Sequence, residues 1–229
     1  MFFMSILVVG ILFTNTKNSP SETTVFNSKS TIFTNNDNNI PSSDTHVYNW
    51  THQGINYLTN FSISKEDYQF YKDQKRTWCC NDWKKYITPY DPTIVQIANK
   101  IKNDFPNDTE KAIINFAESA KFQYDKDYNG EDNYPKYPIE TVIDGRGDCE
   151  DLAFLTAALL KNLDIKTVLL YYKQHVAIGI ECKNNCTGTY YTYNNTKYYF
   201  LETTAGADVW TIGQANQKYI DETPKIEEI

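Results

Sequence analysis

The chain has 229 residues, which is enough for one core domain of ordinary size with extensions. Its 22 basic residues are outnumbered by 29 acidic ones, so the formal net charge is -7 at pH 7. This balance, and the lack of any basic cluster in the sequence, argues against nucleic acid as a partner.

The chain opens with an apolar run, FFMSILVVGILF, in residues 1–13. The run is shorter than the roughly 20 residues that span a bilayer, and it matches the hydrophobic part of a secretory signal or of a membrane anchor. Residues 14–45 are rich in Asn, Thr and Ser and predict a flexible tether. We therefore expect an extracellular protein, either secreted or tethered to a membrane by its N-terminal segment. The sequence leaves cleavage of that segment open.

Helical signals dominate the next part of the chain. Residues 46–89 predict a helical extension, with a short helix that begins near Ser64. An Asp-Pro pair opens a second helix over residues 91–105. Residues 108–120 predict a third helix, because their apolar side chains recur at helical spacing.

Residues 124–138 predict a loop that is rich in oxygen-bearing side chains. These are Asp125, Asp127, Asn129, Glu131 and Asp132. Such side chains bind calcium in some loops, but the spacing here is not that of an EF-hand. We therefore expect a solvated acidic loop.

The stretch DGRGDCEDLAFLTAALLKNL, residues 144–163, organises the rest of the chain. Its apolar residues leave almost no polar face, so it predicts a helix that is buried on every side. Cys149 stands where the loop becomes the helix, after the N-cap Asp148, and the helix N-terminus favours a thiolate there. Asp148, Glu150 and Asp151 act in the opposite direction, because nearby negative charge raises the pKa of a thiol. We interpret Cys149 as a candidate nucleophile.

Beyond this helix the pattern becomes extended. Four strands are predicted, at residues 167–173, 176–181, 190–193 and 198–202. Helices followed by antiparallel strands indicate an α+β fold in which the cysteine helix packs on an antiparallel sheet. Residues 214–229 predict an acidic tail.

The chain has five cysteines, so at least one thiol stays free if the others pair. With Cys149 set aside, the remaining four allow three connectivities. A Cys182–Cys186 bridge would close a short loop, whereas the adjacent Cys79 and Cys80 could bond only in a strained geometry. Zinc is the alternative, but adjacent cysteines lack the separation of a usual zinc pair. We expect no metal and no organic cofactor.

His175 and Glu202 are the residues that could serve Cys149 in catalysis. His175 lies at the start of a predicted strand, and Glu202 ends the last predicted strand. In such a set the thiolate attacks a carbonyl carbon, the imidazolium protonates the leaving amine, and the carboxylate orients the ring. Each residue also has an ordinary structural interpretation, but the Cys-His-acid order on helix, strand and strand favours catalysis.

The segments YPKYPIETVIDGRGDCEDLAFLTAALLKNL, HVAIGIE and YYFLETTAG resemble the transglutaminase-like superfamily. The similarity is greatest to a branch of prokaryotic, often archaeal, surface proteins with a Gly-Asp-Cys-Glu-Asp core, and it covers residues 90–213. This resemblance implies a papain-like fold with Cys149 as nucleophile, His175 as general acid–base and Glu202 as third member. Asp is commoner in the third place, so Asp208 is the alternative if the strand register differs.

We therefore expect a thiol-dependent acyl-transfer enzyme that acts on amide bonds of proteins or peptides, for example in the cell envelope. Hydrolysis of the peptidase or isopeptidase type is favoured over protein cross-linking. The alternative is a catalytically idle surface domain that keeps the fold for binding or structure. The reactivity of Cys149 would distinguish these two hypotheses.

Overall fold

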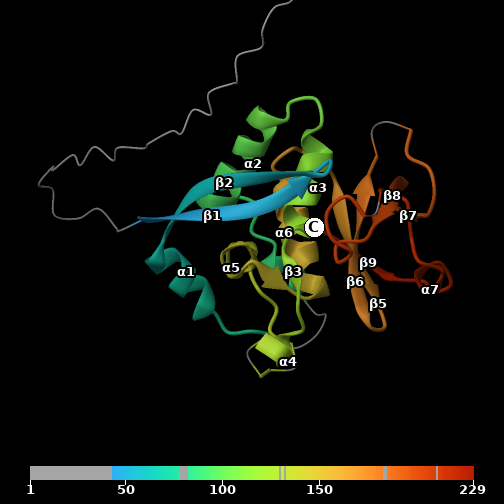
Figure 1. Cartoon of the computed structure of the whole chain (residues 1–229). Helices are drawn as coiled ribbons and strands as arrows, with labels where there is room; N and C mark the ends of the chain where they lie inside the picture. The colour runs from blue at the N-terminus through green and yellow to red at the C-terminus, as the bar shows by residue number, and fades with distance from the viewer. Residues whose placement is uncertain (1–42, 78–81, 129, 132, 183–184, 210) are drawn as a thin grey trace, which may run out of the picture. The chain divides into compact units, whose positions relative to one another are not determined.

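The computed structural model describes residues 43–77, 82–128, 130–131, 133–182, 185–209 and 211–229 (Figure 1). The described residues all lie in one compact unit. The expected signal or anchor, nearly all of the expected tether, and Cys79 and Cys80 fall outside them. None of the described helices is long and apolar enough to cross a membrane.

The first described element is a β-hairpin, so the prediction of a helical extension is wrong for its first part. Strands β1 (Ser43–His52) and β2 (Ile55–Ser64) pair antiparallel along their whole length. One face of the hairpin is buried and contributes Tyr48, Trp50, Phe61 and Ile63 to the core. The helix predicted near Ser64 is present as α1 (Lys65–Lys72), and the Ser64 hydroxyl accepts the N–H of Asp67 at 2.9 Å.

A group of helices lies beside the hairpin (Figure 1). They are the 3-10 helix η1 (Trp83–Tyr86), α2 (Pro92–Asp104), α3 (Thr109–Glu118), the short α4 (Asp125–Tyr128) and α5 (Pro138–Asp144). The predicted start of α2 is confirmed, because Asp91 Oδ1 accepts the N–H groups of Thr93 and Ile94 at 2.8 and 3.3 Å. The prediction of a helix over residues 108–120 is confirmed by α3.

Helix α6 (Cys149–Lys161) lies at the centre, between the other helices and the main sheet (Figure 1). It packs against α2, α3 and α5 on one side and against β5 (Thr167–Tyr172) and β6 (His175–Glu181) on the other. Every residue from 150 to 160 is buried. The prediction of a helix buried on all sides is thereby confirmed.

The main sheet has the order β7-β8-β6-β5-β9, and each neighbouring pair is antiparallel. Its other strands are β7 (Tyr190–Tyr193), β8 (Thr196–Leu201) and β9 (Lys225–Glu228). The four predicted strands are therefore present. β9 is an addition, because it and α7 (Gln217–Ile220) belong to the segment that was expected to be an acidic tail.

The two faces of this sheet are covered by different elements. Leu169, Ile178 and Leu201 face the core around α6, whereas Leu170 and Phe200 belong to a second cluster with Tyr219 of α7. The centre of the sheet is closely packed at Gly179 of β6. A Cβ added to Gly179 would lie 2.8 Å from Val168 Cγ2 and 2.9 Å from Tyr198 Cβ, so only glycine fits there without displacement.

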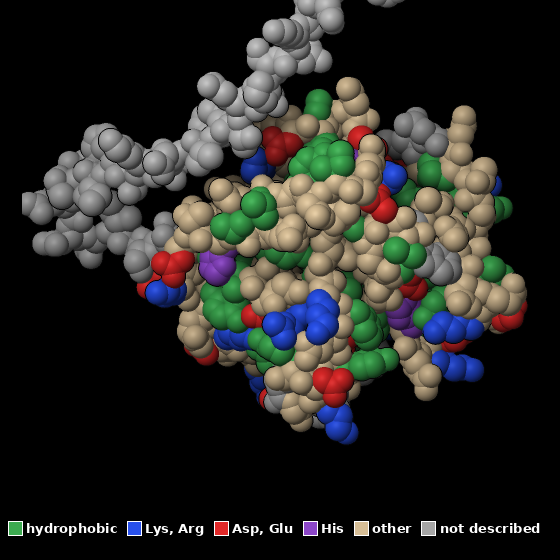
Figure 2. All heavy atoms as spheres, in the orientation of Figure 1, with side chains coloured by type: hydrophobic (Ala, Val, Ile, Leu, Met, Phe, Trp, Pro, Cys, Tyr) green, Lys and Arg blue, Asp and Glu red, His purple; other side chains and the backbone are tan. Residues whose placement is uncertain are grey.

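Short connections complete the unit. A parallel ladder of β3 (Lys121–Phe122) and β4 (Arg146–Gly147) joins the end of the α3 segment to the turn before Cys149. Of the connectivities left open by the sequence, the structure has the Cys182–Cys186 disulfide, and Cys149 is the free cysteine of the described residues. On the face shown in Figure 2, lysine and arginine side chains are interspersed with acidic ones.

Candidate active site

His175 and Glu202 meet at one end of the central strands. His175 is the first residue of β6, and Glu202 directly follows β8, the neighbour of β6 in the sheet. His175 Nε2 lies 3.1 Å from each carboxylate oxygen of Glu202. Glu202 Oε1 also accepts the backbone N–H of Thr204 at 3.1 Å and its hydroxyl at 2.7 Å.

The Glu202 carboxylate is buried but held in its charged form. Burial raises its pKa, yet the hydrogen bond and positive charge of His175 and the two bonds from Thr204 oppose this, so the net pKa is below the usual value. A fixed carboxylate on one ring nitrogen sets the orientation of the imidazole and leaves Nδ1 for another partner.

The structure places Asp208, the alternative third residue, elsewhere. Asp208 Oδ1 accepts from Asn115 Nδ2 at 2.7 Å, and Oδ2 accepts the N–H of Gly54 at 3.0 Å. Asp208 thus ties the loop after Glu202 to α3 and to the hairpin turn. The strand register brings Glu202, and not Asp208, to His175.

Cys149 is the first residue of α6, after Asp148 as N-cap with an extended backbone. Asp151, in the first turn, accepts the Asp148 N–H at 3.3 Å and so fixes the turn that presents the cysteine. The thiol donates to Glu150 Oε2 at 3.2 Å. Within the described residues no hydrogen bond joins the thiol to His175, although α6 packs directly against β6.

The surroundings of Cys149 favour the neutral thiol. Burial is the largest cause, and the charges of Glu150 and Asp148 add to it, so the pKa of Cys149 lies well above its ordinary value. The backbone of Val176, next to His175, acts in the opposite direction. Burial is therefore the main reason that the thiol stays neutral, and the acidic crowding expected from the sequence acts in the same direction.

Tyr219 is a neighbour of this site that the sequence analysis did not indicate. Its ring stacks on the His175 imidazole with 4.7 Å between centroids and 16° between planes. Asn216, the N-cap of α7, accepts the N–H of Lys218 and is the local signal that could have indicated this helix. No local signal pairs Tyr219 with His175, because the contact depends on how α7 folds back onto the sheet.

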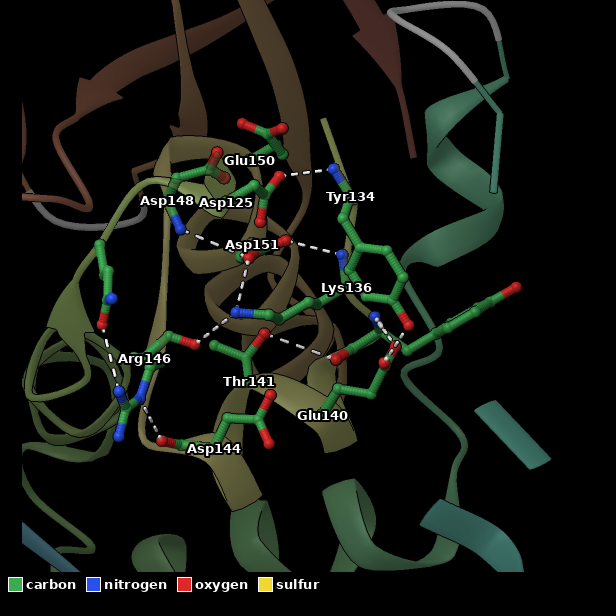
Figure 3. A network of polar contacts seen from close by, with 12 residues as sticks. Asp125, Tyr134, Lys136, Glu140, Thr141, Asp144, Arg146, Asp148, Glu150 and Asp151 are labelled. Atoms are coloured by element: carbon green, nitrogen blue, oxygen red, sulfur yellow. Dashed lines mark hydrogen bonds and ion pairs between the residues drawn. The ribbon is translucent and has the colours of Figure 1, made fainter. Parts of the chain in front are cut away.

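Acidic side chains gather around the N-terminus of α6 (Figure 3). Asp125 is buried there, so the prediction of a solvated acidic loop is wrong for this residue, whereas Asp127 is exposed as expected. Two groups in the described part of the chain have donor atoms close enough to hold a metal ion. They are Asp148 with Cys149 and Glu150, and Asp125 with Asp148 and Asp151.

Comparison with known proteins gives one family. The sequence of residues 27–200 matches the family model of the transglutaminase-like domain. Among solved structures, a candidate cysteine protease from Cytophaga hutchinsonii is similar at 11% identity and a TM-score of 0.35, over 81% of this chain and 72% of that one. A TGase is similar at 12% identity and a TM-score of 0.35, over 76% of this chain.

The chain spans about half of that TGase, 47% of its length. No protein of curated function matches significantly. The family match covers most of the sequence, including Cys149 and His175. Together with the α+β architecture it confirms the resemblance that the sequence motifs indicated: the chain belongs to the transglutaminase-like domain family.

Proposed function

We propose that this protein is an exported thiol enzyme that acts on amide bonds through a thioester at Cys149. The observation that carries the proposal is the His175–Glu202 pair, with Nε2 at 3.1 Å from both carboxylate oxygens. This pair lies at the N-terminal end of β6, the strand on which the cysteine helix packs. The family membership and the fold support this class of chemistry.

We infer a role for each residue from the geometry. Because Nε2 faces Glu202, Nδ1 of His175 is the ring atom that would take the thiol proton. The thiol is neutral at rest, so we infer that its proton moves to Nδ1 as Sγ attacks the carbonyl carbon. The backbone N–H of Cys149 is the candidate donor to the resulting oxyanion.

The second half of the reaction returns the proton. The imidazolium gives it to the leaving amine as the tetrahedral intermediate collapses to a thioester on Cys149. Water then releases the acyl group as an acid, or an amine accepts it as a new amide. We favour hydrolysis of protein or peptide substrates over cross-linking.

A catalytically idle binding domain is the second candidate. The raised pKa of Cys149 favours it, because a binding domain has no need of an ionised thiol. So does the thiol hydrogen bond to Glu150 in place of His175.

Acylation by an activated ester such as p-nitrophenyl acetate tests the enzyme proposal. Intact-protein and peptide mass spectrometry would locate the acyl group, and release of p-nitrophenol would give the rate. We expect a thioester on Cys149 that forms at least about 100-fold more slowly in His175→Gln. Equal rates in the parent and in His175→Gln would favour the catalytically idle domain. So would acylation at other residues in a Cys149→Ala variant at the parent rate.

The fate of the thioester separates hydrolysis from transfer. We expect its decay to be little changed by a millimolar primary amine if water is the natural acceptor. A rate that rises with amine concentration, with the amide product in the mass spectrum, would favour cross-linking. Export is tested separately, by the location of the protein and the mass of its N-terminal peptide in the native cell.

A further inference from the structure

Three aspartates from two segments of the chain meet inside the protein, beside the turn that presents Cys149. Asp125 opens α4, whereas Asp148 and Asp151 are the N-cap and a first-turn residue of α6. One carboxylate oxygen of each lies within 4.8 Å of those of the other two. Figure 3 shows the three side chains converging from the two helices.

These carboxylates are removed from water. Asp125 is 3% exposed, Asp148 is 9% exposed and Asp151 is fully buried. Asp125 Oδ1 and Asp148 Oδ1 have no hydrogen-bond partner among the described residues. Burying a carboxylate oxygen without a partner costs free energy. These two atoms therefore indicate a binding partner that the chain itself does not supply.

The other oxygens of the cluster are held in place by the backbone. Asp125 Oδ2 accepts the N–H of Tyr134, and Asp151 Oδ1 accepts the N–H of Lys136 at 2.7 Å. Asp151 Oδ2 accepts the N–H of Asp148. The bond to Asp125 orients its carboxylate while Oδ1 stays available, as is typical of a metal ligand. Each Asp151 oxygen already accepts one N–H and would bind a cation through its remaining lone pair.

The charge of the cluster also indicates a missing partner. Lys136 is fully buried, and its Nζ lies 3.5 Å from Asp151 Oδ2 and 3.2 Å from the carbonyl oxygen of Arg146. This single ammonium faces three aspartates, with the buried Glu150 beside them. The excess negative charge must be neutralised by protons or by a further cation.

We propose that Asp125, Asp148 and Asp151 bind a hard divalent cation that ties α4 to the N-terminus of α6. The donors are all carboxylate oxygens, which suit Ca²⁺, Mn²⁺ or Mg²⁺. The cation would fix the turn before Cys149, so the site is a positioning device and not part of the chemistry.

Mn²⁺ is the probe, because its electron paramagnetic resonance signal falls when the ion is bound. With the full chain at neutral pH, we expect one saturable Mn²⁺ site with a dissociation constant of about 1 mM or below, and competition by Ca²⁺. Asp125→Asn should weaken binding at least about tenfold. Asp127→Asn is the matched control on the same short helix, where the side chain is exposed, and should leave binding unchanged.

Several outcomes would overturn the proposal. One is the absence of saturable Mn²⁺ binding to the parent chain up to about 10 mM, which needs no variant and no folding control. Another is equal binding by a folded Asp125→Asn and the parent. A third is a site that prefers Zn²⁺ and is lost in Cys149→Ala but kept in Asp148→Asn, which would place the metal on the thiol. If circular dichroism shows Asp125→Asn to be unfolded, Asp148→Asn takes its place in the comparison.

Discussion

Glu118 allows a test of how burial shifts a pKa and thereby changes the stability of the protein with pH. It is the last residue of α3 and is only 2% exposed. Neither of its carboxylate oxygens has a hydrogen-bond partner among the described residues. Burial, and then the negative charges of Glu202 and Asp208, raises its pKa from 4.5 to about 9. Glu118 is therefore protonated in the folded protein at neutral pH.

The sign and size of the effect follow from proton linkage. Between pH 4.5 and about pH 9 the folded state holds a proton on Glu118 that the unfolded state has released. The free energy of unfolding therefore falls by about 1.4 kcal/mol per pH unit as the pH rises, on account of this residue. Its stabilising effect is complete below pH 4.5 and is lost by about pH 9. From about pH 5 to about pH 8 the loss amounts to about 4 kcal/mol.

Glu118→Gln removes this titration. We expect the variant to gain stability relative to the parent as the pH rises, by about 4 kcal/mol between pH 5 and pH 8. Urea unfolding at several pH values, followed by tryptophan fluorescence, measures the difference. Glu66→Gln, at an exposed position in α1, is the control and should follow the parent. Parallel pH curves for Glu118→Gln and the parent would refute the reasoning.

Three other substitutions test separate features. Glu150→Gln removes a carboxylate 3.2 Å from the thiol, so the pKa of Cys149 should fall by at least about one unit. The pH dependence of iodoacetamide alkylation in EDTA measures this pKa, and an unchanged profile would contradict the role given to the Glu150 charge. Gly179→Ala forces a Cβ into the packed sheet and should cost about 1–3 kcal/mol in urea unfolding, where a neutral effect would argue against that packing. Cys182→Ser opens a loop whose cysteines are 4 residues apart and should lower the free energy of unfolding by about 2 kcal/mol. No loss of stability would mean that the bridge is absent in solution.

The sequence predicted those elements whose signals are local. N-caps and apolar spacing located α2, α3 and α6, and runs of β-branched and aromatic residues after α6 predicted most of the sheet. His175 and Glu202 could be paired because His175 starts one strand and Glu202 follows another, in a recognisable order after Cys149. The hairpin escaped prediction because Val47 and Leu58 are exposed on its outer face, which hides the alternation of buried and polar residues.

Other features depend on contacts that no local pattern contains. β9 has the sequence KIEE and resembles a solvated tail, yet its backbone completes the sheet beside β5. Asp125 looks like part of an acidic loop until α4 packs near the N-terminus of α6. The pKa of Cys149 could not be settled from the sequence either, because the position of Glu150 relative to the thiol decides it.

The bonds made by Asp208 bear on how small a working fragment could be. They connect the loop after Glu202 to Gly54 in the hairpin and to Asn115 in α3. Trp50 and Phe116 also pack edge to face across the same boundary, with 5.6 Å between ring centroids. A fragment that began at Tyr90 would expose this aromatic surface and release the loop that positions Glu202. The minimal unit that preserves the candidate site therefore includes the hairpin, although none of its residues touches His175 in the described contacts.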